Sequence, residues 1–182
     1  MKRSVLAALF AAGALATPAL AALSVNDGAP DFTLQGYMAG KPTSFNLNQA
    51  LKSGPVVVYF FPAVHTGGCN LEAHLFAEAA DDFKKEGATV IGITAGNLDQ
   101  LQVFSTETQY CSGKFPVFAD TGLKVAKQYK ATTMLLPGMS DRTSYVIGAD
   151  HKIVVAYSAA NPTKHVAMTM DGVKKWKSEH HS

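Results

Sequence analysis

The chain has 182 residues, which suits one ordinary domain, and its 16 basic and 14 acidic residues give a net charge of +2. Two of the basic residues, Lys2 and Arg3, stand at the extreme N-terminus, so the rest of the chain has 14 basic (16 − 2) and 14 acidic residues. This balance excludes the broad basic surface with which proteins bind nucleic acid or anionic lipid.

The first 21 residues have the pattern of a secretory signal peptide. Two basic residues precede an apolar run over residues 5–15, and the segment ends on the small residues Ala19 and Ala21, which suit a cleavage site. The apolar run is too short to favour a permanent membrane span. We therefore expect residues 1–21 to be removed and residues 22–182 to form one exported, periplasmic domain that is not attached to the membrane. An uncleaved anchor helix is the alternative.

After this segment, predicted strands alternate with predicted helices. Residues 31–47 contain two short alternating pieces with turn residues between them, which predict a β-hairpin, and residues 46–53 predict a helical turn. Continuous β-branched and aromatic runs predict strands buried on both faces at residues 54–62 and 88–94. Apolar residues at helical spacing predict helices over residues 69–87, 97–110, 121–130 and 163–179. A short strand at 115–120 and a hairpin at 142–159 complete the set.

The order of these elements predicts an α/β fold. Buried strands that alternate with helices pair in parallel through right-handed crossovers, whereas the closing hairpin must add antiparallel strands. The result is a mixed central β-sheet flanked by helices, which is a thioredoxin-like fold with an extra N-terminal β-hairpin.

The stretch that begins at Pro62 places a threonine and two glycines directly before Cys69. It joins a predicted buried strand to a predicted helix, so we expect Cys69 in the first helical turn, where unpaired N–H groups and the helix dipole stabilise a thiolate. Gly67 and Gly68 would let a small substrate approach those N–H groups. Thr66 is expected to cap the helix or to turn its hydroxyl toward the thiolate. Pro62 fixes the turn that leaves the strand.

The residues alone leave three interpretations of Cys69 open. It could form a structural disulfide with Cys111, the only other cysteine, because disulfides persist in exported proteins. It could bind a metal with His65 and His74, although positions 69 and 74 do not share a helix face. It could also be a nucleophile, but not half of a C-x-x-C dithiol, which the chain lacks. Among the other histidines, His165 is expected to cap or pack on the last helix.

The sequence PAVHTGGC at residues 62–69 matches P-x-x-x-T-x-x-C, the active-site signature of peroxiredoxins. Together with GAPDFTL (28–34), VVVYFFP (56–62) and RTSYVI (142–147), in the same order, it makes the chain resemble the peroxiredoxin Q (bacterioferritin comigratory protein) subfamily of the AhpC/TSA superfamily. The resemblance implies a monomeric, thiol-dependent peroxidase without metal or other cofactor. It implies hydrogen peroxide and organic hydroperoxides as substrates, and a thioredoxin-like protein or small thiol as external reductant.

The resemblance also implies roles for single residues. Cys69 aligns with the peroxidatic cysteine, Thr66 with the threonine that hydrogen-bonds thiolate and peroxide, and Pro62 with the proline that shields the site. Arg142 aligns with an arginine that comes from a distant strand and stabilises the charge that develops as the O–O bond breaks. Glu72, one turn after Cys69, is expected either to hold Arg142 through a carboxylate–guanidinium pair or to be solvated on the helix surface.

The resemblance places the resolving cysteine at one of two positions in the sequence. Many members of the subfamily place a resolving cysteine five residues after the peroxidatic one, where this chain has His74. Cys111, expected late in the helical stretch after the second buried strand, then resolves the Cys69 sulfenic acid as an intramolecular disulfide, with Ser112 and Gly113 as a hinge. Resolution by an external thiol is the alternative. A rival from another class is an exported thioredoxin-like binding or chaperone domain with a permanent Cys69–Cys111 staple.

Overall fold

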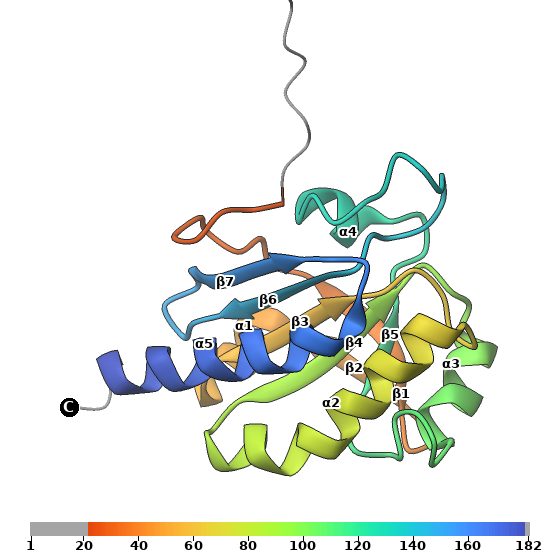
Figure 1. Ribbon diagram of the computed structural model, residues 1–182, viewed down its shortest axis with the longest axis horizontal. Helices are drawn as coiled ribbons and strands as arrows, with labels where there is room; N and C mark the ends of the chain where they lie inside the picture. Colours follow the sequence, from red (N-terminus) through yellow and green to blue (C-terminus); the bar gives the residue numbers. More distant parts are fainter. Residues whose placement is uncertain (1–21, 181–182) are drawn as a thin grey trace, which may run out of the picture.

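The computed structural model describes residues 22–180, which form a seven-stranded mixed sheet with helices on both faces (Figure 1). The predicted signal peptide, residues 1–21, lies outside the described residues. The strands are β1 (Thr33–Met38), β2 (Lys41–Asn46), β3 (Val56–Phe60), β4 (Thr89–Thr94), β5 (Val117–Ala119), β6 (Thr143–Ile147) and β7 (Ile153–Ser158). The helices are α1 (Leu47–Ala50), α2 (Gly67–Lys85), α3 (Leu98–Thr106), α4 (Lys124–Gln128) and α5 (His165–His180), with 3-10 turns η1 (Leu51–Ser53) and η2 (Pro162–Lys164). Over residues 22–180, no helix is long and apolar enough to cross a membrane.

The strand order is β2-β1-β5-β4-β3-β6-β7. Strand β4 pairs in parallel with β3 and with β5, and the remaining pairs are antiparallel. The predicted mixed sheet is therefore confirmed. Strands β1 and β2 form an antiparallel hairpin, and β1 also pairs with β5, so this hairpin continues the central sheet.

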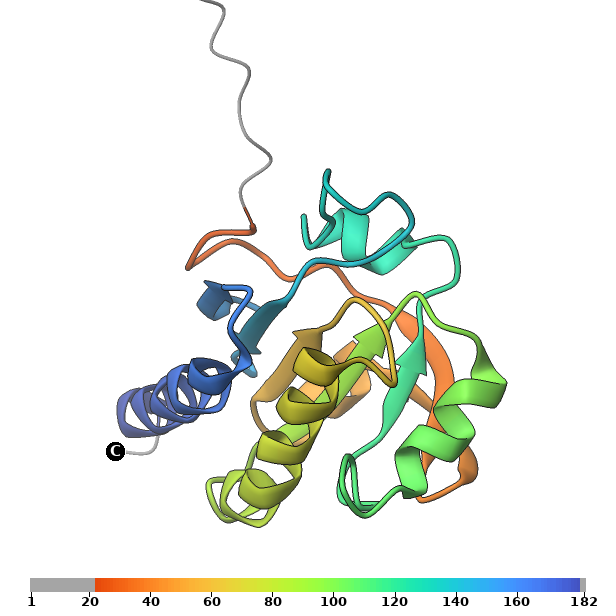
Figure 2. The same ribbon diagram turned by 45° about the vertical axis from the view of Figure 1, so that its right-hand side comes forward.

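Strand β3 is buried on both faces, as its continuous apolar run predicts. Val57 and Tyr59 face one core, which α2, α3 and α5 cover, whereas Val56 and Val58 face a second core, which α1 and α4 cover. Figures 1 and 2 show α2 and α5 side by side over the first face, with α4 apart from them. The site described below lies on the face of α2 and α5.

One predicted helix is shorter than expected. The pattern over 97–110 predicts a helix, but α3 ends at Thr106, and Glu107 is already extended, with φ −62° and ψ 120°. The hydroxyl of Thr106 donates to the carbonyl of Val103, so a side chain competes with the helical backbone bonds near this end. The prediction that Cys111 lies in this helix is wrong. Cys111 lies in a series of turns after it.

Candidate active site

Cys69 lies in the first turn of α2, directly beyond the carboxyl end of β3. Helix α2 begins at Gly67, and Thr66, with an extended backbone, occupies the N-cap position. The first N–H groups of a helix have no intrahelical acceptor, and the helix dipole is positive there. Cys69 is only 1% exposed. The predicted position of Cys69 in the first helical turn is confirmed.

Arg142 reaches Cys69 because β6 pairs antiparallel with β3. Thr143, the first residue of β6, lies opposite Phe60, the last residue of β3, so the residue before β6 lies next to the start of α2. Nη2 of Arg142 donates a hydrogen bond to Sγ of Cys69 over 3.4 Å. The sheet thus brings together two residues that are 73 positions apart and places a guanidinium against the sulfur.

Glu72 holds the guanidinium in place. Nη1 of Arg142 donates to Oε2 of Glu72, and Nε donates to the carbonyl of Ala160 over 3.0 Å. Glu72 is fully buried, so the alternative that it is solvated on the helix surface is wrong. Burial raises the pKa of Glu72 to about 8, although Arg142 acts in the opposite direction. Burial alone would lower the pKa of Arg142, but Glu72 and Cys69 raise it overall.

The two glycines of the motif have different surroundings. A Cβ at Gly68 would lie 2.9 Å from Nη2 of Arg142, whereas a Cβ at Gly67 would meet nothing within 4 Å. The sequence predicts that the space at both glycines admits a substrate. At Gly68 the structure fills that space with the guanidinium, so the absence of a side chain there lets Arg142 approach Cys69.

Thr66 makes neither of its predicted contacts. Its exposed hydroxyl donates to the carbonyl of Ala63 over 3.1 Å, and among the described residues it neither caps α2 nor hydrogen-bonds Cys69. The reason is the turn before it, where His65 adopts a left-handed φ of 57° and the carbonyl of Ala63 comes within reach. Pro62 leaves the strand as predicted, and its carbonyl accepts a hydrogen bond from Thr94 over 3.2 Å.

Cys111 is a fully buried free thiol in the same apolar cluster as Cys69. Burial, and secondarily the charge of Glu107, raise its pKa well above the ordinary value for a thiol. The two sulfurs are not bonded in this structure. Tyr59 lies close enough to both cysteines for each to raise its pKa, after the larger effect of its own burial. Its hydroxyl is buried without a hydrogen-bond partner in the described part of the chain.

The two histidines near the motif pair with different carboxylates. Nε2 of His65 lies 2.8 Å from Oε2 of Glu107, and Nε2 of His74 lies 3.5 Å from Oε1 of Glu78 on the surface of α2. The His65 pair therefore ties the loop before Cys69 to the segment before Cys111. Over residues 22–180, no three His, Cys, Asp or Glu side chains form a group that could hold a metal ion.

Comparison with known proteins gives the family. Residues 25–156 match the AhpC/TSA family over most of the described chain. The chain belongs to the AhpC/TSA family. It is 32% identical over 142 residues to the chloroplastic peroxiredoxin Q of Sedum lineare, covering 78% of this chain and 73% of that protein. It is 34% identical over 151 residues to the chloroplastic peroxiredoxin Q of Oryza sativa subsp. japonica, covering 81% of this chain and 65% of that protein.

A solved structure agrees with these relatives. The peroxidoxin BcpB of Mycobacterium tuberculosis has a TM-score of 0.71 and 27% identity, covering 83% of this chain and 96% of that chain. The prediction of a thioredoxin-like fold and of a peroxiredoxin Q/bacterioferritin comigratory protein is confirmed. The chain is a thiol-dependent peroxidase.

His165 lies beside the site of this peroxiredoxin, which the sequence does not predict. The residue packs at the start of α5 as expected, but it is fully buried and its Nδ1 lies 3.4 Å from Oε1 of Glu72. Nothing in the pattern of the last helix indicates this contact, because it depends on how α5 is placed against α2.

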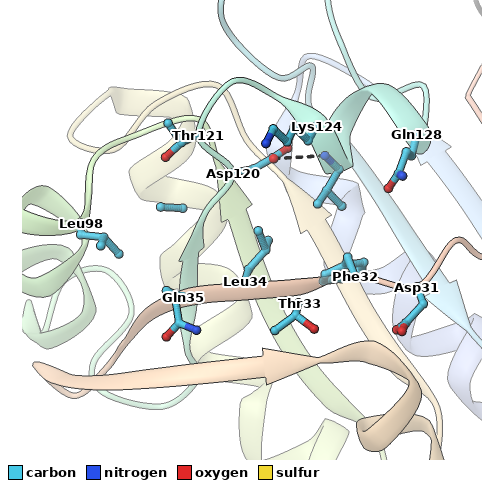
Figure 3. A pocket seen from close by; sticks show the side chains of 12 residues that line it. Asp31, Phe32, Thr33, Leu34, Gln35, Leu98, Asp120, Thr121, Lys124 and Gln128 are labelled. Carbon is cyan, nitrogen blue, oxygen red and sulfur yellow. Dashed lines mark hydrogen bonds between the residues drawn. The ribbon is translucent and has the colours of Figure 1, made fainter.

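A separate hollow of about 530 Å³ lies between β1 and α4 of the peroxiredoxin (Figure 3). None of the residues assigned to the active site lines it. Its buried acid, Asp120, accepts hydrogen bonds from the N–H groups of Val125 (3.1 Å) and Ala126 (2.8 Å). Asp120 therefore serves as a cap for α4 and is not free for a ligand.

Proposed function

We propose that this peroxiredoxin reduces hydrogen peroxide and organic hydroperoxides through direct attack by the thiolate of Cys69. The observation that carries the proposal is the hydrogen bond from Arg142 to the buried sulfur, with Glu72 fixing the guanidinium. The sulfur attacks one peroxide oxygen, an S–O bond forms, and the O–O bond breaks. The departing hydroxide or alkoxide keeps the electron pair and takes a proton from solvent, and Cys69 becomes a sulfenic acid. Arg142 and the first N–H groups of α2 stabilise the charge that develops.

Cys111 then resolves the sulfenic acid. Its sulfur forms a bond with the sulfur of Cys69, the S–O bond breaks, and water leaves. Two equivalents of an external thiol, from a thioredoxin-like protein or a small thiol, reduce the disulfide and become oxidised in turn. The turns around Cys111 support this step, because Ser112 and Gly113 have left-handed φ values of 51° and 64° and the helix has already ended. Such a segment opens more readily than a helix interior.

Replacing Cys111 by serine tests the resolution step. The Cys111→Ser protein is expected to consume one equivalent of peroxide, and its sulfenic acid should live at least about tenfold longer than that of the parent, because the partner thiol is missing. Labelling with a sulfenic-acid probe such as dimedone at successive times, followed by mass spectrometry, measures this lifetime. If the parent accumulates as much labelled Cys69 as the variant, an external thiol resolves Cys69 and Cys111 does not.

The His65–Glu107 pair should restrain the movement that resolution requires. Glu107→Gln weakens a pair that is partly exposed, so we expect the disulfide to form up to about fivefold faster. Rapid alkylation of free thiols after a peroxide pulse gives the rate. Glu86→Gln is the matched control, because it weakens a similarly exposed pair with Lys177 of α5, at the end of α2 opposite to Cys69. Equal rates in the two variants would contradict the restraint.

We further propose that the protein acts as an exported monomer. The proposal is supported by the basic and apolar pattern of residues 1–21 and by the subfamily resemblance. Mass spectrometry of the protein recovered from the periplasm tests export, with an N-terminus at Ala22 expected and an intact Met1 contradicting it. Light scattering of the same material tests the monomeric state.

A further inference from the structure

Only one of the two carboxylate oxygens of Glu72 accepts a hydrogen bond from a described residue. Oε2 accepts from Arg142, whereas Oε1 is buried and receives no hydrogen bond from any described residue. A buried carboxylate oxygen without a donor is costly. Nδ1 of His165 lies 3.4 Å from Oε1 without a hydrogen bond between them, which is close enough for the charge on one side chain to act on the other.

The surroundings of His165 make Nδ1 the nitrogen whose protonation state is open. Nε2 lies 3.0 Å from the carbonyl oxygen of Ala159, which can only accept, so Nε2 carries a hydrogen. Nδ1 lies 2.8 Å from the hydroxyl of Ser144, which can donate or accept. Nδ1 can therefore be a bare acceptor or carry a second proton, and it is the nitrogen that faces Glu72.

We propose that Glu72 and His165 hold one proton between them, and that this proton keeps Arg142 available to the thiolate of Cys69. Without it, the buried site would hold two negative charges, on Glu72 and Cys69, against the single positive charge of Arg142. Uncompensated buried charge is strongly unfavourable. With the proton in place the charges balance, and the thiolate becomes the main counter-charge of the guanidinium. His165 is a positioning residue, since it acts through Glu72.

The other titratable groups around Glu72 and His165 are compatible with one proton on the pair. Tyr157 on β7 packs its ring edge-on against His165, with centroids 4.8 Å apart, and Asp141 adds a negative charge before β6. Tyr59 faces Glu72 from β3, and burial raises its pKa, so its hydroxyl stays neutral. Burial also raises the pKa of Glu72 to about 8 and lowers the pKa of His165, which favours placing the proton on the carboxyl group.

The proton has a definite effect on the thiol. When the pair loses it, a negative charge appears beside Arg142 and weakens the attraction between the guanidinium and the sulfur of Cys69. The thiolate is then less favourable and forms only at higher pH. Replacing His165 by glutamine removes the Nδ1 acceptor and presents amide N–H groups that favour the ionised carboxylate, so the pair loses its proton at lower pH.

The experiment measures the pH dependence of Cys69 alkylation by iodoacetamide in the Cys111→Ser background, where Cys69 is the only thiol. His165→Gln is expected to move the midpoint upward by about one pH unit, which lowers the alkylation rate below the midpoint about tenfold. Glu72→Gln fixes a neutral side chain at the position, so adding it to His165→Gln should remove the shift. An unchanged midpoint in His165→Gln, or a shift that persists beside Glu72→Gln, overturns the proposal.

A second variant separates this effect from packing. Thr169 lies one turn further along α5, is fully buried, and donates to the carbonyl of His165 over 2.7 Å. Thr169→Val therefore perturbs the same helical turn without removing Nδ1, and we expect no change in the alkylation midpoint. A shift equal to that of His165→Gln would overturn the proposal.

The inference rests on the proposed function only in taking the Cys69 thiolate as the attacking group. Alkylation needs no peroxide, so the two ideas fail separately. A parent protein that is alkylated as expected but does not consume peroxide would contradict the proposed function. An active parent whose midpoint does not respond to His165→Gln would contradict the shared proton alone.

Discussion

Cys69→Ser is expected to lower the rate of peroxide reduction by at least about a thousandfold, because a serine hydroxyl is not ionised near neutral pH and cannot replace the thiolate as nucleophile. The side chain is almost completely buried, and serine is nearly the same size, so the fold should be retained. Peroxide consumption by pre-reduced protein, with thiol reductant in excess, measures the effect.

Cys111→Ser is the matched control for this substitution. It also replaces a buried cysteine by serine, but in the segment after α3, and it leaves the thiol that Arg142 contacts in place. It should keep the first reaction with peroxide at close to the parent rate and lose only the internal resolution step. Consumption by the Cys69→Ser protein within about tenfold of the parent would contradict the assignment of Cys69 as nucleophile.

Arg142→Gln is expected to slow the reaction of Cys69 with peroxide by about a hundredfold to a thousandfold, the usual cost of removing a donor aimed at developing negative charge. Arg142→Lys should give an intermediate rate, since it keeps the charge but cannot contact Glu72 and Cys69 with two nitrogens at once. Stopped-flow measurement of a single turnover reports the chemical step. A rate equal to that of the parent would contradict the role of Arg142.

Arg142→Gln should also change the free energy of unfolding in a pH-dependent way. Glu72 has a pKa of about 8 in the folded parent, raised from 4.5, so its folded state binds the proton more tightly than its unfolded state. Removing Arg142 takes away a charge that lowers this pKa, which then rises further. The free energy of unfolding falls as the pH rises from the unfolded pKa of Glu72 to its folded pKa, and then levels off. The parent therefore stops losing stability above about pH 8, whereas Arg142→Gln continues to lose it, so the stability deficit of the variant should widen above that pH. Urea unfolding at several pH values tests this, and in a Glu72→Gln background the deficit should not widen.

The sequence predicts the central part of the site because its signals are local. The apolar run of β3 requires burial on both faces, and the glycines after it mark the start of α2, so the position of Cys69 follows from neighbouring residues. The approach of Arg142 does not follow from local spacing. It depends on the antiparallel register of β6 on β3, and only the motif resemblance indicated it.

The remaining differences arise where local patterns have little information. The sequence pattern after Asn97 predicts a helix that continues past Thr106. The hydroxyl of Thr106 instead bonds to the backbone and Glu107 is extended, so the helix ends and Cys111 lies in turns. Threonine is a common N-cap residue, but the hydroxyl of Thr66 donates to the carbonyl of Ala63 in the preceding turn instead of capping α2. His165 lies 93 positions after Glu72 (165 − 72), and their contact depends on the packing of α5 on α2.

The central claim is that Cys69 is oxidised by peroxide and then bonds to Cys111. The most direct test adds one equivalent of hydrogen peroxide to fully reduced protein without any other thiol, alkylates the remaining thiols, and maps the peptides by mass spectrometry. We predict that the peroxide is consumed, that both thiols are lost, and that Cys69 and Cys111 are joined by a disulfide within one molecule. Unconsumed peroxide with both cysteines alkylated would contradict this account.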